Sequence, residues 1–107
     1  MSGPLFVELG VGFELALARH FPDMEDASGH PPSADTFLDL DLGRVVETFM
    51  HRWDDLNTVV GTEGRKRFAV IACHSVRAVV VHGHLGDDDT IELIDIEPDL
   101  TPFSEGD

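Results

Sequence analysis

Apolar residues recur at helical spacing in the middle of the chain. From Leu42 to Leu56 they follow one another at intervals of one or three residues, which is the period of a single buried stripe on an α-helix. The stripe consists of Leu42, Val45, Val46, Phe49, Met50, Trp53 and Leu56. The spacing predicts an amphipathic helix from Leu42 to Val60, with Asp41 as its N-cap and Gly61 at its C-terminal end. Trp53 is expected in the core.

Beyond Gly64 the helical period gives way to β-branched residues. Three runs, Phe68–Cys73, Val76–Leu85 and Thr90–Ile96, are separated by short polar turns, which predicts a three-stranded antiparallel meander. The middle run is apolar on both of its faces, so we expect a central strand with something packed on each side. The predicted helix would cover one face, and the N-terminal segment the other.

The third of these runs does not alternate regularly. Ile91 and Leu93 would point to one side of the sheet together with Asp95, whereas Ile94 and Ile96 would point to the other. A β-bulge in this run, or burial of both faces, would account for the break.

The N-terminal segment fits two patterns. Its apolar residues match a helix that starts near Pro4, but they also alternate as in a strand, and Gly10 and Gly12 disfavour a helix by about 1 kcal/mol each. We predict a strand or hairpin up to Gly12 and a helix from Phe13 to His20. Residues 22–36 are predicted to form an acidic, proline-rich loop, and residues 98–107 a flexible tail.

Together these elements predict a single α+β domain over residues 1–107: a small antiparallel sheet with one long amphipathic helix on a face. Hydrophobic residues make up 42% of the chain and include seven Phe, enough to form a core. Cys73 is the only cysteine, so no internal disulfide forms, and we expect a cytoplasmic protein. Glu8 and Glu14 argue against an export signal in the apolar N-terminal stretch, and no apolar run is long enough to serve as a membrane anchor.

The net charge constrains the function of the chain more than any motif does. The chain has 21 acidic residues against seven Lys and Arg, a formal charge of −14, and three of its cations are adjacent at Arg65, Lys66 and Arg67. Such a charge excludes direct binding to nucleic acid or anionic membranes, because the phosphates of both would be repelled. It favours a basic protein surface as the partner.

The acids of the C-terminal fifth are the first candidates for this contact. Residues 87–107 contain nine acids and no cation. Carboxylates at alternate strand positions lie about 7 Å apart, close to the spacing of successive phosphates in a nucleic-acid strand. The competing interpretation is that these acids are the solvated side of an ordinary acidic domain. The residues expected to contact the partner are Asp87, Asp88, Asp89, Glu92, Asp95, Glu97 and Asp99, with Asp54 and Asp55 on the outer helix face.

Two His residues raise the alternative of a metal site. His82 and His84 are two residues apart on a predicted strand, so both lie on one face, and an Asp of the turn at Asp87 to Asp89 could complete a ligand set. We expect them instead to be partners in a local charge cluster, with no metal and no cofactor bound. Cys73 and His74 are adjacent on a strand and point to opposite faces, so they do not form a nucleophile and base pair.

The leading hypothesis is a non-enzymatic acidic protein that occupies a basic surface, for instance that of a nucleic-acid-binding protein. In size and charge alone the chain resembles toxin-immunity proteins and phage-encoded inhibitors that imitate nucleic acid, such as the anti-CRISPR class. A second hypothesis is a structural or assembly domain adapted to high salt or encoded by a high-GC genome, because 13 of the acids are Asp and Arg outnumbers Lys six to one. A third is a small metal-dependent enzyme that uses His82 and His84. Self-association as a homodimer is compatible with each.

Overall fold

The C-terminal runs of β-branched residues form the centre of a five-stranded sheet. The computed structural model describes residues 5–24 and 32–100. In it, β3 (Lys66–Ala72), β4 (Ala78–Leu85) and β5 (Thr90–Asp99) pair antiparallel in sequence order, so the predicted meander is confirmed.

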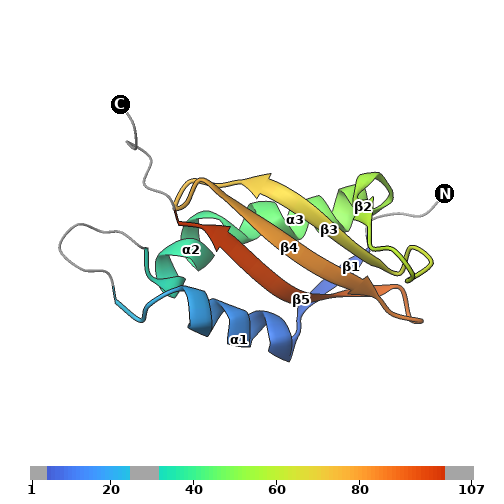
Figure 1. Ribbon diagram of the computed structural model, residues 1–107, viewed down its shortest axis with the longest axis horizontal. Coiled ribbons are helices and arrows are strands. Elements are labelled where there is room, and N and C mark those ends of the chain that lie inside the picture. The colour runs from blue at the N-terminus through green and yellow to red at the C-terminus, as the bar shows by residue number, and fades with distance from the viewer. Residues whose placement is uncertain (1–4, 25–31, 101–107) are drawn as a thin grey trace.

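Two short strands extend this meander at its edges. β1 (Phe6–Leu9) pairs parallel to the first half of β5, and β2 (Asn57–Thr58) pairs antiparallel to β3, which gives the order β1-β5-β4-β3-β2. The fold is therefore α+β with a mixed sheet, as Figure 1 shows.

Three helices accompany the sheet in the described residues, where two were predicted. They are α1 (Val11–His20), α2 (Ala34–Leu40) and α3 (Leu42–Arg52), the last followed by a 3-10 turn over Trp53–Asp55. None of these described helices is long and apolar enough to cross a membrane.

The core lies between the helices and one face of the sheet. Phe13, Phe37 and Phe49, one from each helix, are fully buried in a single cluster with the inward residues of the three central strands. Those inward residues are Ala69, Ile71, Val79, Val81, Ile91, Leu93 and Ile96. The N-terminal segment thus joins the same core as α3 and does not cover the second face, so the expectation of packing on each side of β4 is wrong.

A β-bulge in β5 explains the broken alternation of its sequence. Leu93 lies opposite Gly83 and Asp95 lies opposite His82, which leaves Ile94 as the extra residue. The bulge puts Ile91, Leu93 and Ile96 on the same buried face. The expectation that Asp95 shares a face with Ile91 and Leu93 is wrong, because the extra residue turns Asp95 to the opposite side.

The bulge coincides with the point where the chain leaves β1 and enters α1. The Gly10 N–H donates to the Leu93 carbonyl at 2.9 Å, and a Cβ on Gly12 would lie 2.5 Å from the Ile94 carbonyl oxygen. Glycine at position 12 therefore permits α1 to pack directly on the β5 backbone. The strand ends at Leu9 and the helix begins at Val11, both earlier than predicted.

The predicted boundaries need three further corrections. α3 ends at Arg52 instead of Val60, and Gly61 takes its positive φ of 86° in the turn between β2 and β3. α2 was not predicted: Ser33 caps it by accepting a hydrogen bond from the Thr36 N–H at 3.2 Å, so residues 34–36 are helical. β5 continues through Asp99, so its last two residues belong to the sheet and not to a tail. Residues 25–31 of the predicted loop and 101–107 of the predicted tail lie outside the described residues.

Candidate functional site

The sheet face opposite the helices presents an ordered set of side chains, which we call the open face. Strand register places these residues in four rows that run across β3, β4 and β5. The rows are Lys66–His84–Glu92, Phe68–His82–Asp95, Val70–Val80–Glu97 and Ala72–Ala78–Asp99. β5 contributes a carboxylate to every row, whereas β3 contributes an apolar side chain to three of them.

Apolar side chains at the centre of the open face are accessible to solvent. Val70 is 65% exposed, and Val80 beside it is half-buried. The rings of Phe68 and His82 lie with their centroids 5.6 Å apart and are tilted by 37° to each other. An exposed apolar strip bordered by charges is a common composition for a protein-binding surface.

The carboxylates of β5 border this strip on one side. Asp95 and Glu97 are exposed, and Glu92 is half-buried with its side chain against Gly10. Glu8 of β1 lies opposite Glu92 and extends the acidic row to the sheet edge. Within the described residues, none of these four carboxylates forms an ion pair, so their charge is available to a partner. The sequence did not indicate Glu8, because only the parallel pairing of β1 with β5 brings it here.

Asp87, Asp88 and Asp89 were expected to contact the partner together with these acids. They occupy the turn between β4 and β5, where two of them form contacts within the protein. Asp87 forms an ion pair with Arg65 at 2.8 Å, and Asp88 accepts a hydrogen bond from the Thr90 N–H at 3.1 Å. Asp89 takes a positive φ of 64°, as Asp does in tight turns. They lie at one end of the open face and shape the turn.

Asp54 and Asp55 are separated from the other predicted contact residues. Both lie in the 3-10 turn after α3, in the helix layer, and Asp55 is 3.8 Å from Arg52 in an exposed ion pair. The structure therefore does not bring them to the open face.

The basic triplet does not form one patch. Arg65 pairs with Asp87, while the Arg67 guanidinium donates to the Trp53 carbonyl at 2.8 Å and lies 5.0 Å from the centroid of the Trp53 ring. Lys66 points to the open face opposite His84. The three cations thus lie in three different surroundings.

His82 and His84 share the open face, as predicted, but their neighbours differ from those expected. They lie opposite Asp95 and Glu92 on β5 and not beside Asp87 to Asp89. Among the residues that the structure describes, no three His, Cys, Asp or Glu side chains are placed to hold a metal ion.

Asp41 occupies the N-cap position of α3, as predicted, but it is buried and its side chain forms no hydrogen bond that caps the helix. Its carboxylate instead accepts hydrogen bonds from the His74 N–H at 2.6 Å, the Ser75 N–H at 2.8 Å and the Ser75 hydroxyl. The nearby Cys73 has its pKa raised to about 11 by burial and by the Asp41 charge. The thiol is therefore protonated at neutral pH and is not an activated nucleophile.

Comparison with known proteins found no matching family model, no matching curated protein and no matching solved structure.

Proposed function

We propose that this protein is a non-enzymatic binding protein that docks its open face on a basic surface of another macromolecule. The observation that carries the proposal is the register of β5, which gives each of four consecutive rows a carboxylate. Beside these acids lies the accessible strip of Phe68, Val70 and Val80, whose burial would add stability to the complex.

The charge of the whole chain supports the same partner. A net charge of −14 attracts a basic surface from a distance and speeds association, while the acids and the apolar strip determine the docked orientation. Beyond the bulge, Asp95, Glu97 and Asp99 occupy alternate positions, about 7 Å apart along the strand. Because that spacing resembles successive phosphates, we favour a nucleic-acid-binding protein as the partner and inhibition of that protein as the role. We place this interaction in the cytoplasm.

The test is capture of proteins from the native host's lysate at low salt, followed by elution with rising salt. The wild-type chain should retain a basic protein that elutes at a defined ionic strength. Asp95→Lys with Glu97→Lys should abolish its retention, because the open face then repels the partner. The matched control is Asp39→Lys with Glu47→Lys, which changes the net charge equally on the exposed sides of α2 and α3.

The control separates a specific face from overall acidity. If both double variants retain the protein equally, or lose it equally, while a thermal melt shows them folded, the open face is not the binding site.

A further inference from the structure

The outer edge of β3 has backbone groups without a strand partner. The Lys66 carbonyl accepts from the Val59 N–H on the β2 side, while the Cys73 N–H donates to Arg77 on the β4 side. Backbone groups alternate in direction along a strand, so Val70 and Ala72 direct theirs outward. β2 pairs only with Arg67 and Phe68, and no hydrogen bond joins the outward groups of Val70 and Ala72 to another described residue.

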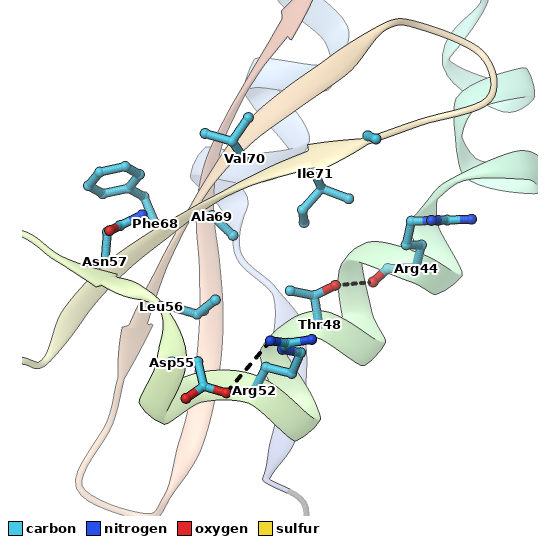
Figure 2. Close-up of a pocket in the computed structure, with 11 residues that line it drawn as sticks. Arg44, Thr48, Arg52, Asp55, Leu56, Asn57, Phe68, Ala69, Val70 and Ile71 are labelled. Carbon is cyan, nitrogen blue, oxygen red and sulfur yellow. Dashed lines mark hydrogen bonds and ion pairs between the residues drawn. The ribbon is translucent and has the colours of Figure 1, made fainter.

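A groove of about 370 Å³ runs along this edge between β3 and α3. Figure 2 shows Arg44, Thr48 and Arg52 of α3 on one side of the groove and the strand from Phe68 to Ile71 on the other. Arg44 and Arg52 are exposed, and among the described residues the only carboxylate that lines the groove is Asp55, which pairs with Arg52 at 3.8 Å. Cations thus outnumber acids here by two to one, in a chain where acids outnumber cations threefold.

We infer that this edge binds an extended acidic peptide of another protein, which adds to the sheet as a sixth strand. The outward groups of Val70 and Ala72 are exposed and open to main-chain partners, and an extended segment presents donors and acceptors at the matching spacing. Arg44 and Arg52 then favour acidic side chains on the face of the added strand that points toward α3.

The geometry of α3 fixes the spacing of the acids in that peptide. Arg44 and Arg52 are eight residues apart, which corresponds to about 12 Å along a helix. An extended strand covers about 13 Å in four residues, close to this distance, and residues i and i+4 lie on the same face. The peptide should therefore carry acids at i and i+4, with apolar residues at i+1 and i+3 to contact Val70 on the open face.

A second copy of the chain is a less suitable occupant than a short peptide. It would bring a charge of −14 against an equal charge, whereas a peptide with two acids brings −2 and delivers both to arginines. The strand itself does not repel a peptide, because Phe68 to Ala72 contains neither a charge nor a proline, the features that usually block a sheet edge.

The experiment is a titration of the isotopically labelled chain, followed by NMR, with the capped heptapeptide Thr-Glu-Val-Thr-Val-Glu-Thr. The Val70 and Ala72 amide signals should shift, and their exchange with solvent should slow. The control peptide Thr-Glu-Val-Thr-Glu-Val-Thr has the same composition with its acids on opposite faces, and it should bind about fivefold more weakly.

Variants of the chain test the two parts of the site. Arg44→Gln with Arg52→Gln should weaken binding about tenfold, whereas Arg19→Gln with Arg65→Gln, outside the groove, should leave it within about twofold. Val70→Pro removes one outward N–H and should abolish binding in a chain that a thermal melt shows to be folded.

Three outcomes would overturn the inference: unchanged Val70 and Ala72 signals on saturation, equal affinity for both peptides, or full affinity after loss of both arginines. If the wild-type chain does not bind the peptide but forms a dimer, and Val70→Lys dissociates that dimer, then the edge binds a second copy of the chain and not a peptide. These readouts do not depend on Asp95 and Glu97, so they are independent of the test of the open face.

Discussion

Asp41 joins two segments that are more than thirty residues apart. It is fully buried at the start of α3, and its carboxylate accepts two hydrogen bonds from backbone N–H groups and one from the Ser75 hydroxyl in the turn between β3 and β4. A buried carboxylate is stable only when such donors satisfy it, and the donors in turn depend on the carboxylate. The helix layer and the central hairpin are therefore fixed to each other by one side chain.

Replacement of this carboxylate should lower stability strongly. Asp41→Ala leaves the His74 and Ser75 amides without acceptors, which should cost about 3 kcal/mol of unfolding free energy. Asp39→Ala, at an exposed position of α2, should change it by less than about 0.5 kcal/mol. Urea denaturation measures both, and equal midpoints for the two variants would mean that the Asp41 contacts contribute little.

Cys73 gives the stability of the protein a specific dependence on alkaline pH. Burial and the Asp41 charge raise the thiol pKa from 9.0 to about 11, so the unfolded chain loses this proton first as the pH rises. Stability should therefore fall between pH 9 and 11, and Cys73→Ala should show a smaller fall. The chain has one Lys and no Tyr, so few other groups titrate in this range. Melting temperatures from pH 8 to 11 test this, and parallel curves for the two proteins would contradict it.

At the scale of elements, the contact between α1 and the β5 bulge determines what position 12 tolerates. Alanine usually stabilises a helix relative to glycine by about 1 kcal/mol. At Gly12 the added Cβ would lie too close to the Ile94 carbonyl oxygen. This is a backbone atom, so it cannot move away unless the strand itself shifts. The local preference for alanine and the tertiary contact therefore act in opposite directions.

Two glycine variants separate these effects. Gly12→Ala should destabilise the protein by about 1–3 kcal/mol, because α1 must move away from β5. Gly43→Ala in α3, where a Cβ would meet nothing within 4 Å, should stabilise it by about 0.5–1 kcal/mol. Thermal unfolding followed by circular dichroism gives both signs. A stabilising Gly12→Ala would show that α1 does not press on the bulge.

The elements that the sequence predicted well are those determined by local periodicity. The stripe from Leu42 places Val45, Phe49 and Trp53 in the core, and the meander follows from three β-branched runs. The end of α3 was overestimated because Leu56 continues the apolar spacing although the chain has already turned toward β2.

What could not be predicted depends on contacts between distant segments. Sequence spacing alone does not reveal that β1 pairs parallel to β5, so the place of Glu8 in the acidic row was missed. The break at Ile94 did indicate a bulge, but not that the bulge would bring Asp95 to the open face. The groove beside β3 also escaped prediction, because it exists only where β2 is too short to cover the strand.

At the scale of the whole molecule, a set of carboxylates lies on the open face of the sheet while arginines line a groove by its far edge. If the acidity serves binding, we expect the domain to fold without added salt. Its core forms one continuous cluster, and the buried side-chain polar atoms within the described residues have hydrogen-bond partners. If the acidity is instead an adaptation to brine, dilute buffer should leave the carboxylates unscreened and the fold unstable.

Melting in dilute buffer and in 2 M sodium chloride distinguishes these interpretations. We expect a cooperative transition in both, with a rise of about 5 °C in salt as repulsion is screened. An unfolded chain in dilute buffer would favour salt adaptation over a binding role for the acids.

The uncovered edge of β3 also bears on how the protein behaves at high concentration. Its five consecutive uncharged residues could template a ribbon in which copies join edge to edge, and mutual repulsion between strongly anionic molecules holds them apart at neutral pH. Acidification toward the isoelectric point removes that barrier while leaving the template intact. Precipitation or fibril growth in mildly acidic conditions should therefore start from this strand.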